Sequence, residues 1–137
     1  MIENASSPEL RDALQSHLRE TQGQIARLEQ VFSSVKIEPS TKDNDILDKL
    51  MNAAKDSVSN IEASSLRDAA LIINGNQVEH YEIALYGSLA AFARSLGLQT
   101  AASLLEETLT EEKNADTKLT QIGESVMNPK AARHQTA

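Results

Sequence analysis

Apolar side chains recur every three to four residues along four segments of the chain, and this spacing predicts four helices. The longest segment, residues 65–94, carries two neighbouring stripes that make the helix apolar around most of its girth. The first stripe contains Ile72, Asn76, Glu79, Ile83, Tyr86, Ala90 and Ala93, and the second contains Leu66, Ile73, His80, Ala84 and Gly87. A helix of this kind is expected to be central and packed on several sides.

Serine, proline and glycine mark the ends of the predicted helices. Ser7 followed by Pro8 indicates a helix start, because serine caps and proline suits the first turn. Gly97 follows the longest segment in the position that glycine favours after a helix. Asn128–Pro129 is expected to end the last helix. The four predicted helices cover residues 8–32, 43–57, 65–94 and 99–126. No segment alternates with a period of two, so the predicted fold is all-α, a four-helix bundle.

Composition narrows the class of protein. The 137 residues fit one domain, predicted over residues 1–127, with residues 128–137 as a flexible basic tail. The net charge of −7 argues against nucleic-acid binding and against attraction to anionic membranes. The chain contains no cysteine, which excludes disulfides and thiolate metal sites. It also shows no long apolar run and no secretory signal, so we expect a cytoplasmic location.

Acidic and imidazole groups lie on or near the apolar faces of the three long helices. An unpartnered carboxylate costs several kcal/mol to bury, so each such group needs a cation, a proton or hydrogen bonds. Carboxylates and imidazoles that converge from facing bundle helices form di-iron and di-manganese sites, and these hard ligands suit Fe or Mn. The candidate metal ligands are His17, Glu20, Glu79, Glu82, Glu112 and Asp116. No catalytic residue can be assigned.

A structural interpretation of the same residues stays open. Acidic residues occupy 20 of 137 positions, so some fall near an apolar stripe by chance. We expect Glu106, Glu107 and Glu111 on a solvated face, and His80 as a packing histidine with satisfied hydrogen bonds. Glu79 is expected to be buried, because its stripe neighbours are apolar. Two functions remain, a metal-dependent oxidase or peroxidase and a non-enzymatic structural or interaction module.

Six runs of residues form a specific combination that extends over most of the chain. The runs are Ser7-Pro8-Glu9-Leu10, His17-Leu18-Arg19-Glu20-Thr21, Asp68-Ala69-Ala70-Leu71-Ile72, Glu79-His80-Tyr81-Glu82-Ile83, Tyr86-Gly87, and Leu105 to Leu109 with Glu111-Glu112-Lys113. This combination resembles the YciE/YciF family of the ferritin-like superfamily. The resemblance implies a ferritin-like helical fold, usually dimeric, in bacterial proteins linked to stress responses. It also implies a di-metal carboxylate site, by similarity to rubrerythrin and ferritin.

Two departures from the family pattern bear on that site. Family members usually begin with a further helix that carries a Tyr-x-Ala-Glu-x-Gln-like motif, and residues 1–5 correspond only to its end. Relatives also usually have glycine and glutamate at the positions of Lys49 and Ala53. The resemblance therefore implies a ferritin-like bundle that lacks the first long helix and has a partly degenerate di-metal site. We expect a homodimer, because a second copy would cover the apolar groove left by the missing helix.

Overall fold

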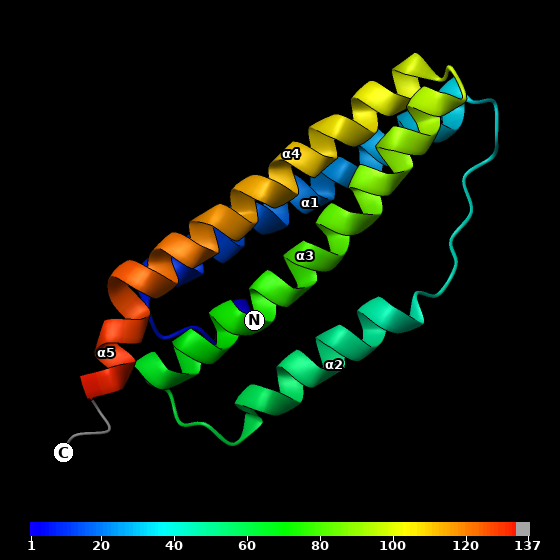
Figure 1. Cartoon of the computed structure of the whole chain (residues 1–137). Helices are drawn as coiled ribbons and strands as arrows, with labels where there is room; N and C mark the ends of the chain where they lie inside the picture. Colours follow the sequence, from blue (N-terminus) through cyan, green and yellow to red (C-terminus); the bar gives the residue numbers. More distant parts are fainter. Residues whose placement is uncertain (134–137) are drawn as a thin grey trace.

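The computed structural model describes residues 1–133, which are almost entirely helical (Figure 1). The elements are η1 (Ile2–Asn4), α1 (Pro8–Ser34), α2 (Asp45–Ser59), α3 (Ser65–Ser95), α4 (Gln99–Ile122), the π-helical turn η2 (Gly123–Met127) and α5 (Asn128–Arg133). These residues contain no strand, so the all-α prediction is confirmed. Within the same range, no helix is both long and apolar enough to cross a membrane.

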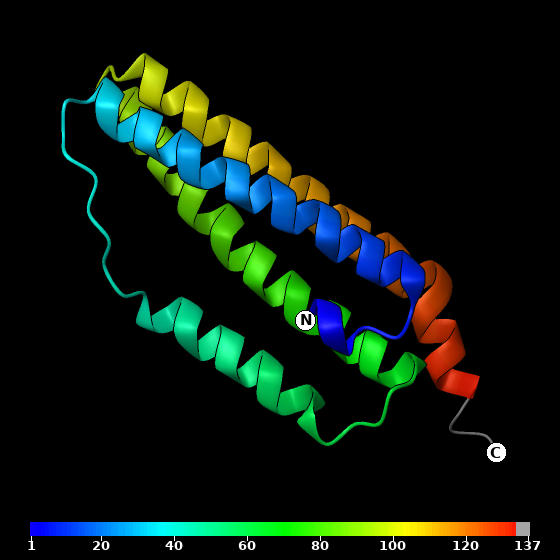
Figure 2. The same cartoon turned by 180° about the vertical axis from the view of Figure 1, so that it is seen from behind.

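The three long helices, α1, α3 and α4, run side by side, and α2 lies along α3 (Figures 1 and 2). α4 packs on both α1 and α3, whereas α2 packs on α3. Both views show α3 between the α1–α4 pair and α2. The side of α3 that lies between α1 and α2 is therefore less completely covered than in a closed bundle.

Local chemistry fixes the helix ends close to the predicted positions. The side chains of Ser7, Asn44 and Ser64 each accept a hydrogen bond from a backbone N–H three residues later, at the starts of α1, α2 and α3. Gly97 follows α3 with a φ of 74°, and Lys36 follows α1 with a φ of 57°. A Cβ is unfavourable in this left-handed region, so Gly97 adopts it without strain and Lys36 does not.

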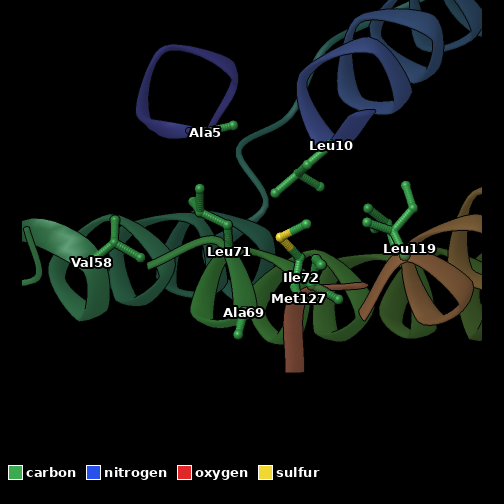
Figure 3. Packing of buried hydrophobic residues seen from close by; sticks show 9 residues of the cluster. Ala5, Leu10, Val58, Ala69, Leu71, Ile72, Leu119 and Met127 are labelled. Carbon is green, nitrogen blue, oxygen red and sulfur yellow. The ribbon is translucent and has the colours of Figure 1, made fainter. Parts of the chain in front are cut away.

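Two apolar clusters hold the long helices together, one toward each end of the bundle. The first, drawn in Figure 3, contains Ala5, Leu10, Val58, Ala69, Leu71, Ile72, Leu119, Ile122 and Met127. The second contains Tyr86, Ala90, Ala93, Ala101, Ala102 and Leu105. Along α3 and α4 the two clusters leave a gap at the middle of each helix, and polar residues occupy it.

α3 is packed on several sides, by α4, α2, α5 and η2, but its two predicted stripes are not equally covered. Its first stripe is buried or half-buried, but Ile73 of the second stripe is 59% exposed and Leu66 is 45% exposed. The reason is the three-helix arrangement, in which α4 and α2 cover other sides of α3.

The last helical region extends further than predicted. Helical structure passes through Asn128–Pro129 and ends at Arg133 within the described part of the chain. Pro129 directly follows the π-helical turn η2, in which the N–H of Asn128 donates to the carbonyl of Gly123 five residues earlier. The rest of the predicted tail, residues 134–137, lies outside the described residues.

Candidate metal centre

Each of the three long helices contributes one side chain to a polar cluster at the middle of the bundle. The side chains are His17 from α1, Glu79 from α3 and Glu112 from α4, and one ligand atom from each lies within 4.8 Å of the others. Glu79 is 4% exposed and Glu112 is 0% exposed, so the predicted burial of Glu79 is confirmed. We call these three residues the central cluster.

The helical repeat explains why the three side chains converge. His17 lies seven residues from both Leu10 and Gln24, and all three positions face inward on α1. Glu112 has the same relation to Leu105 and Leu119 on α4. Because seven residues are close to two helical turns, such positions share one face. Each flanking residue is at most 5% exposed, so the central cluster occupies core positions.

The imidazole of His17 lies between the two carboxylates. His17 Nε2 is 3.2 Å from Glu79 Oε1 and 3.6 Å from Glu112 Oε2. On the other side of the ring, His17 Nδ1 is 3.5 Å from Glu20 Oε2. The Glu20 side chain is 45% exposed, so this carboxylate lies at the edge of the cluster.

Burial and the charges of neighbouring groups shift the pKa values of His17, Glu112 and Glu82. The hydrogen bond to Glu79 raises the pKa of His17 to about 9 against the opposing effect of burial. Burial, together with the neighbouring Glu79 and Glu82, raises the pKa of Glu112 to about 8. The pKa of Glu82 is also raised, first by burial and then by the Glu79 charge. At neutral pH, His17 is therefore charged and Glu112 holds a proton.

Several polar atoms of the cluster have no hydrogen-bond partner although they are buried. They are Glu79 Oε2, both carboxyl oxygens of Glu112, and His17 Nδ1. Native proteins satisfy nearly all buried polar groups, so these atoms require an ion, ordered water or a different proton arrangement. Two carboxylates and an imidazole, with no thiolate, form a hard donor set. The residues therefore fit an Fe or Mn ion.

Two hollows connect the central cluster with solvent. A groove of about 490 Å³ between α1, α2 and α3 is lined by His17, Glu79 and Glu82, and residues 1–4 line it as well. A hollow of about 310 Å³ between α1 and α4 is lined by His17 and Glu20. Glu82 therefore reaches the same groove as the cluster without belonging to it, and small molecules have a route to His17.

Asp116 lies apart from the central cluster. Its Oδ1 atom is 3.3 Å from Nε2 of His80, whose side chain is 68% exposed. The prediction that His80 is a packing histidine is therefore wrong, because most of its side chain is exposed to solvent. Asp116 follows Glu112 by four residues, and the resulting rotation of about 40° turns it toward the outer edge of the α3–α4 contact.

A polar network beside the cluster was not predicted from the sequence. Arg27 of α1 makes two hydrogen bonds to Glu111 of α4, with Nη1 at 2.7 Å from Oε2 and Nη2 at 2.6 Å from Oε1. It also donates to Thr108, and Gln24 donates to Glu111. Glu111 is only 24% exposed, so its predicted solvated position is wrong. The three-residue spacing of Gln24 and Arg27 on α1 was the available signal for this contact with α4.

A long helical bundle whose facing helices bring carboxylates and an imidazole together defines a ferritin-like protein. The chain belongs to the family described as "domain of unknown function (DUF892)", whose sequence profile matches residues 1–132. It is similar to Protein YciF of Escherichia coli (strain K12), with 43% identity over 130 residues that cover 92% of this chain and 76% of that protein. The resemblance to the YciE/YciF family is thereby confirmed.

Solved structures support the same fold. The crystal structure of the E. coli stress protein YciF matches with a TM-score of 0.88 and 41% identity, over 93% of this chain and 80% of that chain. YcfI of Rhodopseudomonas palustris, described as a candidate structural protein, matches with a TM-score of 0.84 and 43% identity, over 87% of this chain and 76% of that chain. The predicted ferritin-like fold is confirmed.

Proposed function

We propose that this chain is a YciF-type bacterial stress-associated protein that binds Fe or Mn at the centre of its bundle. One observation carries the proposal, namely the convergence of His17, Glu79 and Glu112 with buried oxygens that have no partner. The link to stress rests on the description of the E. coli relative as a stress protein.

The centre is best described as a partly degenerate di-metal site. The central cluster offers three ligands to one ion, and Glu20, beside His17, and Glu82, in the adjoining groove, are further carboxylates that could serve a second ion. Asp116, the sixth candidate ligand, contacts His80 instead. The second position is therefore less complete than the first.

The residues of the chain would hold the ion, release protons to solvent when it binds, and admit small molecules. A bound Fe or Mn ion would supply redox chemistry toward dioxygen or peroxide. Binding would require His17 and Glu112 to release the protons that they hold at neutral pH. The groove that Glu79 and Glu82 line would give a small oxidant access to the ion.

A second candidate function is a non-enzymatic structural or interaction module without metal. The specific observation in its favour is that the cluster can balance its own charge, because a charged His17 faces Glu79 and a protonated Glu112 adds none. The description of the R. palustris relative as a candidate structural protein agrees with this role.

Metal analysis of protein purified without chelator separates the two functions. Bound Fe or Mn in the parent, lost in Glu79→Gln and Glu112→Gln, supports the metal protein. Glu29→Gln is the matched control, since Glu29 is an exposed glutamate on α1. No metal in the parent, even after incubation with Fe(II) or Mn(II), would support the structural module.

We also propose that the chain acts as a homodimer in the bacterial cytoplasm and binds neither nucleic acid nor membranes. The net charge of −7 supports the exclusion of polyanionic partners. The incomplete cover of α3 supports the dimer.

A further inference from the structure

The groove between α1, α2 and α3 is much larger than a metal ion, and much of its wall is apolar. The apolar part is formed mainly by Leu14 and Leu18 of α1, Leu47 and Met51 of α2, and Val78 of α3. Leu18 is 47% exposed and Met51 is 45% exposed, so both present apolar surface to an occupant of the groove. The volume of about 490 Å³ lies within the range of small-molecule sites, roughly 300–1,000 Å³. The groove therefore has the size and the wall of a site for a small organic molecule.

Carboxylates lie at the middle and at one end of this groove. Its lining extends over residues 14–21 of α1 and residues 75–82 of α3, about 10 Å along each helix. The two helices run in the same direction (Figure 1), and His17 faces Glu79 at the middle of both stretches. Glu82 therefore lies at one end of the groove. A molecule bound along the groove can contact the apolar wall and still reach both carboxylates with one end.

Both carboxylates have hydrogen-bonding capacity that the described part of the chain does not use. Glu79 is 4% exposed, and its Oε2 atom has no hydrogen-bond partner, although its Oε1 atom lies 3.2 Å from Nε2 of His17. Glu82 forms no hydrogen bond and no ion pair with any described residue. A buried carboxylate without a partner is costly, so the groove favours an occupant that donates charged hydrogen bonds at this point.

The charges along the groove favour a cation over an anion. The described residues that line it include Glu3, Glu79, Glu82 and His17, but neither lysine nor arginine. His17 carries at most one positive charge against these three carboxylates. A ligand with a carboxylate or phosphate group would therefore meet like charges, whereas a cationic group would meet opposite ones.

We propose that this groove binds a small organic cation with an apolar body, of the class of primary alkylamines. The ammonium group lies at Glu82 and at Oε2 of Glu79, and the apolar body lies along the wall that includes Leu18 and Met51. An ammonium group has three N–H donors, so it can serve both carboxylates at once. Burial of the apolar body supplies binding free energy, and the charged head selects the ligand. This inference goes beyond the proposed metal site, because it concerns an organic ligand and applies to the metal-free chain.

Isothermal titration calorimetry of chelator-stripped protein with matched eight-carbon probes tests the proposal. One molecule of n-octylamine should bind per chain, at least about tenfold more tightly than 1-octanol or octanoate, which have the same tail without the positive charge. Methylamine, which has the head without the tail, should bind at least about a hundredfold more weakly than n-octylamine. Equal binding of n-octylamine and 1-octanol would overturn the cationic class, and no binding of n-octylamine would overturn the site.

Two variants test where the ligand lies. Glu82→Gln removes a carboxylate and should weaken n-octylamine binding by about tenfold, whereas Glu29→Gln, outside the groove, should not. Leu18→Lys places a positive charge in the groove and should weaken binding by a similar factor. Its matched control is Ile25→Lys, since Ile25 is 60% exposed on α1 and lies outside the groove lining.

Circular dichroism of equal helicity confirms that the four variants fold. Unchanged n-octylamine binding in Glu82→Gln or in Leu18→Lys would overturn the proposed position of the ligand. The titrations contain no metal, so their outcome is independent of the proposed metal site, which the metal analysis of the parent tests separately.

Discussion

At the scale of single residues, protons on the central cluster take the place that a cation would take. Glu112 is fully buried and lies near Glu79 and Glu82, so its charged form is disfavoured. His17 is favoured as the charged form, because it faces Glu79. Both groups therefore bind protons more tightly in the folded chain than in the unfolded chain.

This difference predicts that the metal-free protein loses stability as the pH rises. The Glu112 contribution is full below its ordinary pKa of 4.5 and is lost as the pH rises to about 8. The His17 contribution is full below 6.5 and is lost as the pH rises through about 9. Denaturant unfolding with chelator should show this decline, and Glu112→Gln should show a smaller one. Parallel pH profiles for parent and variant would contradict the assignment.

A second residue-scale prediction concerns Asp68, which anchors the start of α1 to α3. This 2% exposed carboxylate accepts hydrogen bonds from the backbone N–H groups of Ser6 (2.7 Å) and Ser7 (2.8 Å). Asp68→Ala should lower the free energy of unfolding by about 2–3 kcal/mol, because two charge-assisted bonds are lost. Urea unfolding measures the change, and Asp12→Ala, at an exposed position of α1, is the control. Equal losses in the two variants would refute the anchor.

At the scale of elements, α1 ends in a conformation that its sequence does not favour. The N–H of Ile37 donates to the carbonyl of Phe32 and that of Lys36 to Ser33, each at 3.1 Å, as in a Schellman motif. Lys36 occupies the left-handed position that glycine usually holds.

Lys36→Gly should therefore stabilise the protein. Relief of left-handed strain outweighs the entropy that glycine adds to the unfolded chain, and the expected gain is about 0.5–1 kcal/mol. Thermal melts measure the change. Lys42→Gly is the control and should be neutral or destabilising, since Lys42 lacks a positive φ. A gain in the control equal to that of Lys36→Gly would show that strain is not the cause.

Helix existence and helix starts could be predicted from the sequence because they depend on local chemistry. Ser7 and Pro8 act within one turn, and the apolar period acts within each helix. The exposure of Ile73 and of His80 could not be predicted, because it depends on which other helices pack on α3. The continuation past Pro129 depends on the π-helical turn before it, which has no clear sequence signal.

The same distinction between local sequence signals and helix packing applies to the residues of the candidate site. Glu79 could be predicted because its stripe neighbours are apolar, and Glu112 lies midway between Leu105 and Leu119. Asp116 points away from the cluster because it is rotated by about 40° around α4 relative to Glu112. The spacing of polar residues beside an apolar stripe does not resolve a rotation of this size. The pairing of Arg27 with Glu111 required the register between α1 and α4, which only the three-dimensional structure provides.

At the scale of the whole molecule, the arrangement of helices determines how solvent reaches the central cluster. Two apolar clusters hold the ends of the bundle, and the polar cluster lies between them. The groove between α1, α2 and α3 opens onto this cluster. The uncovered part of α3 lies beyond α2. The proposed metal site and the exposed apolar side chains of α3 therefore lie on different parts of one helix.

Titration of chelator-stripped protein with Mn(II), with free Mn(II) followed by electron paramagnetic resonance, tests the central claim most directly. The parent and Glu29→Gln should bind Mn(II), and more tightly as the pH rises toward 9, because His17 and Glu112 then release their protons. Glu112→Gln should weaken binding by more than about tenfold, since it removes a ligand. If the parent binds Mn(II) no more tightly than Glu112→Gln at any pH, the central cluster is not a metal site.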